Sequence, residues 1–276
     1  MILDGKQLSG ETKEMLKNKI KHYLIKPCLA VIQVGDDEAS NIYIKAKANA
    51  CNEIGLYFKH IKFNVGASEK EVINKIIELN NDDYVDGILI QLPLPLKFDE
   101  YKLINLINKE KDVDGLTDTN MGKLFKGHKG LVPCTPLGII NLLKANDIKI
   151  SGKHAVIVGR SNLVGKPLAM LLLENDATVT ICHSKTDNLI NYTLTADILI
   201  SATGCKNLIT SDMVKKDCVV VDVGMSRVDG KLCGDVASDV MAAYITPVPG
   251  GVGPMTVCTL LQNVLKNYEK KGEFPK

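Results

Sequence analysis

The chain has 276 residues, 45% of them hydrophobic and 24% charged, and its formal net charge is +2. This length and composition allow a full buried core and two domains, while the interspersed charges argue against a protein that binds nucleic acid or a membrane surface through a clustered basic face. Because the first residues lack the basic and apolar segments of a signal peptide, and no apolar run is long enough to span a bilayer, we expect a cytoplasmic protein.

Strands and helices are predicted to alternate along the chain. In the first half we expect strands at residues 28–34, 57–63 and 87–93 and helices near 38–54, 68–79 and 98–108. A helix is expected to begin at Thr135 and Pro136, and apolar strands follow at 154–159, 177–183, 196–204, 218–224 and 243–248. The pattern predicts an α/β protein of two lobes, each a mainly parallel sheet with flanking helices, the second a Rossmann-type doubly wound domain.

The helix at 38–54 carries a lysine at an unusual position. On a helical wheel Lys47 lies at the centre of an apolar stripe that includes Tyr43, Ile44 and Ile54. Such a lysine either extends past its apolar neighbours to water or projects into a cleft between domains. In a partly apolar site its pKa would be depressed, and the amine can then act as a general base or acid near neutral pH.

The strand at 87–93 ends in Gln91, which is followed closely by two prolines. The prolines end strand pairing and fix the direction of the loop. Gln91 is therefore expected at the carboxyl edge of the sheet. There it either hydrogen-bonds a reacting group or satisfies a backbone group of the loop.

An acidic loop, residues 111–120, follows the predicted helix at 98–108. Asp112 or Asp114 could be a helix cap or a turn-forming residue beside Gly115. Alternatively, an aspartate that faces a cleft would suit a ligand edge with two adjacent N–H donors.

The segment 154–174 is predicted to be a strand, a glycine turn and an amphipathic helix. Gly159 and Gly165 allow a sharp turn, so that N–H groups of the first helical turn can meet a pyrophosphate. The motif reads GRSNLVG, with Ser161 where a second glycine is common and one extra residue before Gly165. An ordinary strand–helix turn would give a similar pattern.

The next strand, 177–183, suggests which dinucleotide is bound. NAD enzymes usually carry an acidic residue near its end to hold the ribose hydroxyls. Here His183, Ser184 and Lys185 occupy that place, and Arg160 lies in the glycine turn. These donors suit a ribose phosphate and favour NADP, unless Arg160 and Lys185 are only solvated surface charges.

The segment 243–256 leads from a strand through two prolines and three glycines into a closing helix, whose N-terminus is predicted at residues 254–256. So many conformationally special residues predict a backbone shaped around a flat ligand. The eight cysteines are scattered without a CxxC pair, which predicts reduced, mostly buried thiols and no metal site.

Taken together, these segments resemble the bifunctional methylenetetrahydrofolate dehydrogenase/methenyltetrahydrofolate cyclohydrolase family over essentially the whole chain. The motifs that carry the resemblance occur in order: SNIYIKAK, GILIQLPLP, KDVDG, PCTP, VIVGRSNLVGKP, TVTICHSKT, ISATG, VVVDVG and ITPVPGGVGPMT. The resemblance implies a folate-binding catalytic domain of residues 1–137 plus 255–276, an NADP-binding Rossmann domain of residues 138–254, and a homodimer. It also implies a role in one-carbon metabolism that supplies purine, methionine and histidine biosynthesis.

The resemblance also assigns residues. Lys47 matches the catalytic lysine, Gln91 the residue bonded to it, Tyr43 the aromatic residue that packs on the pterin, and Asp114 the aspartate that anchors the pterin. Catalytic residues would be Lys47, Gln91 and Tyr43, and the substrate would also meet Asp114, Pro249 and Gly250. Expected NADP contacts are Gly159, Arg160, Ser161, Gly165, His183, Ser184, Thr203, Gly204 and Met225, where the family often has isoleucine at the last position. No metal is implied.

The implied reactions are NADP-dependent oxidation of 5,10-methylenetetrahydrofolate to 5,10-methenyltetrahydrofolate and hydrolysis of that product to 10-formyltetrahydrofolate. Two alternatives stay open from the residues alone. One is a two-domain NADP dehydrogenase of the shikimate type, although the combination of Lys47, Gln91 and Asp114 does not favour it. The other is a catalytically silent NADP sensor or scaffold.

Overall fold

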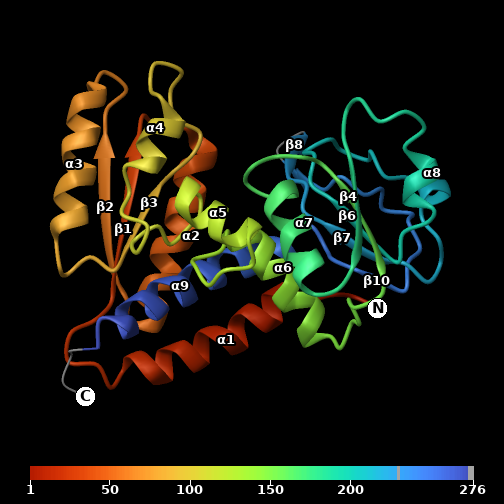
Figure 1. The fold of residues 1–276 in the computed structure, drawn as a ribbon, viewed down its shortest axis with the longest axis horizontal. Helices are drawn as coiled ribbons and strands as arrows, with labels where there is room; N and C mark the ends of the chain where they lie inside the picture. The colour runs from red at the N-terminus through yellow and green to blue at the C-terminus, as the bar shows by residue number, and fades with distance from the viewer. Residues whose placement is uncertain (229–230, 273–276) are drawn as a thin grey trace. The chain divides into compact units, whose positions relative to one another are not determined.

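The computed structural model describes residues 1–228 and 231–272 and contains two compact units. One unit comprises Glu11–Cys134 and Val257–Lys276 and is called the three-stranded unit, and the other comprises Met1–Gly10 and Thr135–Thr256 and is called the five-stranded unit. Both are α/β with parallel main sheets, which confirms the predicted fold class. Figure 1 shows the ribbon with its elements labelled.

The three-stranded unit contains a parallel sheet in the order β2-β1-β3. Its strands are β1 (Cys28–Val34), β2 (Tyr57–Phe63) and β3 (Gly87–Ile90), and its helices are α2 (Glu38–Ile54), α3 (Glu69–Asn81), α4 (Glu100–Asn105) and α5 (Asp118–Phe125). The helices α1 (Gly5–Ile20) and α9 (Val252–Lys270) contribute residues to both units.

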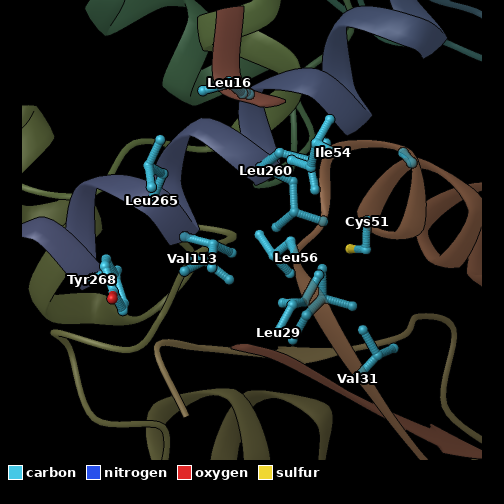
Figure 2. Close-up of a cluster of buried hydrophobic side chains, with 14 of the residues drawn as sticks. Leu16, Leu29, Val31, Cys51, Ile54, Leu56, Val113, Leu260, Leu265 and Tyr268 are labelled. Carbon is cyan, nitrogen blue, oxygen red and sulfur yellow. The ribbon is translucent and has the colours of Figure 1, made fainter. Parts of the chain in front are cut away.

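The central strand β1 is buried along its whole length because alternate side chains enter two different cores. Ala30 and Ile32 pack in the core that includes α3 and α4, whereas Leu29 and Val31 pack in the core that includes α1, α2 and α9. Figure 2 shows the second core, with Leu29 and Val31 among side chains from these helices. Two-sided burial explains why the strand is a continuous apolar run.

The five-stranded unit contains a parallel sheet in the order β10-β7-β6-β4-β5. Its strands are β4 (His154–Val158), β5 (Thr178–Cys182), β6 (Ile198–Ser201), β7 (Val219–Asp222) and β10 (Tyr244–Ile245), and β8 (Ser226–Val228) pairs with β9 (Lys231–Cys233) as an antiparallel ribbon. Its helices are α6 (Cys134–Ala145), α7 (Gly165–Glu174), α8 (Ile190–Thr193) and the short η1 (Ser211–Met213). Since β5 and β6 lie on opposite sides of β4, the chain reverses direction across the sheet there, and ligands of such sheets bind at the carboxyl ends of the strands beside that point.

Residues 1–10 belong to the five-stranded unit, whereas the sequence had assigned them to the other domain. The reason is backbone pairing with β10: the Leu3 N–H donates to the Ile245 carbonyl at 2.8 Å, and the Ile245 N–H donates to the Met1 carbonyl at 3.0 Å. The units divide after Cys134 and after Thr256, each within three residues of the expected boundaries.

Several elements, most of them short, were not predicted. The helices α1, α5 and α8, the 3-10 helix η1 and the ribbon β8–β9 were missed, and the helix expected at 98–108 is the shorter α4. Helix α5 begins within the predicted acidic loop, where the Thr117 hydroxyl accepts a hydrogen bond from the Asn120 N–H, a capping signal that is weak in sequence. In the part of the chain that the structure describes, no helix is both long and apolar enough to cross a membrane.

Candidate active site and cofactor turn

Lys47 lies on α2, and its ammonium donates a hydrogen bond to Gln91 Oε1 at 2.9 Å. The helix is fixed at both ends, because Asp37 accepts the Ser40 N–H at its start and Gly55 has a φ of 81° at its end. Burial lowers the pKa of Lys47, and the negative charge of Asp114 acts in the opposite direction. The side chain is half-buried and does not extend freely into water.

Gln91 is held in one orientation immediately after β3. Its backbone N–H donates to the Ile32 carbonyl at 2.8 Å, and its side-chain nitrogen donates to the Leu92 carbonyl at 2.8 Å. Because the nitrogen is occupied by a carbonyl, the oxygen of the amide faces Lys47. Gln91 therefore satisfies a loop carbonyl, as one of the two predicted roles requires, and it also accepts a hydrogen bond from Lys47.

The acidic loop contains one aspartate that shapes the turn, Asp112, and one that does not, Asp114. Asp112 is buried and accepts hydrogen bonds from the N–H groups of Leu116 and Thr117 and from the Asn120 side chain, so it is the turn-forming residue. Asp114 is half-buried, and its charge interacts with Lys47. Burial raises the pKa of Asp114, while the nearby lysine lowers it.

Tyr43 lies on α2 four residues before Lys47, and it remains 38% exposed although it belongs to the predicted apolar stripe. The other apolar members Ile44 and Ile54 are buried. A partly exposed tyrosine ring one helical turn from the amine has a flat face of the kind that stacks on planar ligands.

The glycine turn between β4 and α7 requires both of its glycines. Gly159 has a φ of 130°, and a Cβ there would lie 2.5 Å from the carbonyl oxygen of Ala202, which follows β6. A Cβ at Gly165 would lie 2.2 Å from the Gly159 carbonyl oxygen. The turn and the segment after β6 are therefore in close backbone contact at the reversal point of the sheet. A close approach of backbone to a pyrophosphate needs such a geometry.

The polar residues predicted beside the turn lie at the carboxyl ends of β4 and β5. Arg160, Ser184 and Lys185 are exposed, and the Ser161 hydroxyl accepts the Val164 N–H at 3.1 Å, which shapes the entry to α7. His183 is half-buried and its Nδ1 accepts the Lys185 N–H at 3.1 Å. The site therefore offers exposed cationic and hydroxyl groups beside a glycine turn, and these residues fit a phosphorylated dinucleotide.

The remaining predicted contacts also belong to the five-stranded unit. Gly204 has a φ of 70° with open space where a Cβ would stand, and Met225 is 39% exposed. Thr203 is half-buried and engaged by a buried aspartate, Asp235. Pro249 is exposed and Gly250 has a φ of 112°, and both precede α9, which begins at Val252 instead of at residues 254–256.

Comparison with known proteins matches both units. Residues 3–114 match the tetrahydrofolate dehydrogenase/cyclohydrolase catalytic domain, and residues 133–272 match the NAD(P)-binding domain of the same family. The chain belongs to the tetrahydrofolate dehydrogenase/cyclohydrolase family. The predicted resemblance and the two predicted enzyme classes, dehydrogenase and cyclohydrolase, are thereby confirmed.

Relatives agree over nearly the whole chain. The bifunctional protein FolD of Mesoplasma florum is 50% identical over 98% of this chain and 98% of its own. The crystal structure of the bifunctional enzyme FolD from Campylobacter jejuni is 48% identical, with a TM-score of 0.97 over 98% of this chain and 99% of that one. The FolD structure of Trypanosoma brucei, described as complexed with NADP cofactor and inhibitor, is 32% identical with a TM-score of 0.94 over 99% of this chain and 98% of that one.

The shikimate-type alternative shares only the fold. The shikimate 5-dehydrogenase of Thermus thermophilus has a TM-score of 0.55 and 16% identity to this chain, over 90% of this chain and 95% of that one. Such a likeness reflects the common pairing of two α/β units and carries no statement about the substrate.

Two side chains that contact the Val113 carbonyl were not predicted from sequence. The Cys134 thiol contacts the Asp114 carboxylate and lies 3.3 Å from the Val113 carbonyl oxygen, and burial together with Asp114 raises its pKa well above the ordinary value. Asn263 of α9 donates to the same Val113 carbonyl at 2.8 Å. The PCTP motif was the available signal for Cys134, whereas nothing in the sequence linked Asn263 to residues 150 positions earlier. In the described residues no group of three or more His, Cys, Asp or Glu side chains could hold a metal ion.

Proposed function

We propose that this chain oxidises 5,10-methylenetetrahydrofolate with NADP and then hydrolyses the 5,10-methenyl product to 10-formyltetrahydrofolate, with Lys47 as the proton-transfer group. The observation that carries the assignment of roles is the hydrogen bond from Lys47 to Gln91 beside Asp114. We further propose that the three-stranded unit binds the folate and that the five-stranded unit binds the cofactor.

Lys47 is suited to move a proton during hydrolysis. Burial lowers its pKa, so a larger fraction of the amine is neutral at a given pH than for a free lysine. Gln91 Oε1 accepts one N–H of the amine, which directs the nitrogen lone pair away from the amide. The neutral amine then takes a proton from the water whose oxygen bonds to the methenyl carbon, and the ammonium gives that proton to the ring nitrogen as the bond between this nitrogen and the carbon breaks. The hydroxyl left on the carbon loses its proton to solvent and becomes the formyl carbonyl, so the cation and water yield the neutral formyl product and one proton. A cationic substrate also disfavours a second positive charge beside it, and this keeps the amine basic.

Asp114 is proposed to hold the pterin. The pterin edge presents a ring N–H and an amino group side by side, and a carboxylate can accept both in a bidentate pair. Asp112 satisfies the backbone of the loop, so Asp114 is not needed for the turn. Tyr43 would stack on the ring, and Pro249 and Gly250 would meet the substrate.

NADP is proposed to lie along the carboxyl ends of β4, β5, β6 and β7. When bound, it supplies a nicotinamide that accepts the hydride from the methylene carbon. Gly159, Ser161 and Gly165 would admit the pyrophosphate to the start of α7, and Arg160, His183 and Ser184 would meet the ribose phosphate. Thr203, Gly204 and Met225 would line the nicotinamide side.

We also propose that the protein is a cytoplasmic homodimer that supplies one-carbon units for purine, methionine and histidine biosynthesis. One structural feature supports the dimer: β2 lies at an edge of its sheet, and an edge strand can pair with another chain. Sedimentation of the purified protein tests this, because a single species with the mass of one chain would contradict it.

One absorbance experiment tests the two reactions. The purified chain is given methylenetetrahydrofolate with NADP or with NAD, and reduced cofactor and the methenyl band are followed together. We expect NADP reduction followed by decay of the methenyl band faster than in buffer. A protein that reduces neither cofactor would refute the dehydrogenase assignment, and decay at the buffer rate would refute the hydrolase assignment.

A further inference from the structure

The carboxylate of Asp235 joins two loops of the five-stranded unit. Asp235 is fully buried, and its Oδ2 accepts three hydrogen bonds from the segment that ends β6. The donors are the Ser201 hydroxyl at 2.7 Å, the Thr203 backbone N–H at 2.7 Å and the Thr203 hydroxyl at 2.8 Å. Three donors on one charged oxygen fix the backbone where the chain leaves β6.

The same side chain packs against the loop after β7. A Cβ at Gly224 would lie 1.8 Å from Asp235 Oδ1, so the two loops meet at a position that only glycine can occupy. Asp222, the last residue of β7, completes the arrangement by accepting the N–H groups of Gly224 and Asp235, each at 3.0 Å. The carboxylate of Asp235 is thus enclosed between the end of β6 and the end of β7.

Asp235 Oδ1 is buried and has no hydrogen-bond partner among residues 1–228 and 231–272. A buried carboxylate oxygen without a donor is unfavourable for stability, and an apolar side chain of similar volume would avoid that cost. The placement is therefore better explained by what Oδ2 holds than by a contribution to folding. It holds Thr203, and it packs on Gly224, which directly precedes Met225.

We propose that Asp235 is a positioning residue for NADP: it fixes the loops after β6 and β7 in the shape that receives the cofactor before the cofactor binds. The inference rests on the proposed function, in which Thr203, Gly204 and Met225 meet the cofactor. If these loops sample other shapes, only a fraction of the protein molecules can bind NADP at any time. The apparent affinity for NADP is then reduced in proportion to that fraction.

The test compares NADP affinity with an activity that needs no cofactor. NADP dissociation constants are measured by titration calorimetry for the full chain and for Asp235→Ala, Asp235→Asn and Ser201→Ala, and hydrolysis of methenyltetrahydrofolate is measured without NADP. We expect Asp235→Ala to raise the NADP dissociation constant at least about tenfold, because it removes the oxygen that accepts all three hydrogen bonds. Ser201→Ala removes only one of the three donors and should raise the constant about threefold. Asp235→Asn keeps one oxygen acceptor and should restore most of the affinity. Hydrolysis should stay within about twofold of the parent in all three.

Two control variants separate positioning from general loss of stability. Ile198→Ala removes a buried side chain at the opposite end of β6, and Asp239→Asn changes an exposed aspartate four residues from Asp235. Both should leave the NADP dissociation constant unchanged, although Ile198→Ala lowers the unfolding midpoint. Unchanged NADP affinity in Asp235→Ala, or an equal loss in Ile198→Ala, would overturn the inference. If circular dichroism shows that Asp235→Ala does not fold, the NADP affinity of Ser201→Ala tests the inference, and an unchanged affinity in that variant would overturn it. A parent protein that does not bind NADP would instead refute the proposed function.

Discussion

Replacing Lys47 by Met tests the role of the amine most directly. Methionine keeps most of the aliphatic volume and removes the only group that can exchange a proton at that position. Gln91, which binds the amine, does not titrate, and Asp114 is engaged by the Cys134 thiol, so neither offers an equivalent base. General acid–base catalysis usually contributes about 100- to 10,000-fold, and we expect a loss of hydrolysis within that range.

The assay follows decay of the methenyl absorbance and subtracts the rate in buffer. In the parent protein the rate should rise with pH as the amine loses its proton, and the midpoint of this rise should lie below the ordinary lysine pKa of about 10.4, because burial lowers the pKa of Lys47. This rise should disappear in Lys47→Met. NADP affinity should change less than about twofold, since Lys47 and the glycine turn belong to different compact units.

Lys45→Met is the matched control, because Lys45 is exposed on the same helix. It should hydrolyse methenyltetrahydrofolate at the parent rate. Retained hydrolysis in Lys47→Met, or the same pH dependence in both variants, would remove Lys47 from the role of base.

Three further predictions concern the cofactor turn and the cores. Arg160→Ala should weaken NADP binding at least about tenfold and NAD binding far less, since only NADP carries the ribose phosphate. Equal losses of affinity for both in calorimetric titrations would show that Arg160 does not contact that phosphate. Gly165→Ala should lower the free energy of unfolding, measured in urea, by about 2–4 kcal/mol, because its Cβ would lie 2.2 Å from the Gly159 carbonyl oxygen. The control Gly122→Ala in α5 has open space around its Cβ and should raise the free energy of unfolding by about 0.5–1 kcal/mol. Leu29→Ala should cost about 2–5 kcal/mol in the same measurement, and a loss under 1 kcal/mol would contradict the packing in Figure 2.

The sequence predicted long, periodic elements better than short ones. The strands at 28–34 and 57–63 and the helix at 38–54 agree with the structure at both ends, because the apolar pattern that marks each of them extends over the whole element. Helix α5 was missed because an eight-residue helix shows little more than two turns of pattern. Helix α1 has only scattered apolar residues, and it is stabilised by packing that its own sequence does not display.

Residues of the candidate site could be predicted only where the local sequence carried a signal. Lys47 was detectable because a charged residue on an apolar stripe contradicts its local surroundings, and Gln91 because two prolines follow it. Asp235 was not detectable, since its donors Ser201 and Thr203 lie 34 and 32 positions earlier and a single acidic residue in a polar stretch has no local signature. Pairing over such distances depends on tertiary structure.

The interleaved chain path has a consequence for synthesis on the ribosome. Leu260 and Val264 of α9 complete the core around Leu29, and Met1 and Leu3 pair with Ile245, so each compact unit needs partners from opposite ends of the polypeptide. The nascent chain can bury neither apolar surface fully until nearly the last helix has emerged. Translation that stalls before residue 245 would therefore leave two incomplete cores exposed at once, and chaperone capture of such intermediates should be much stronger than for a protein whose domains are consecutive in sequence.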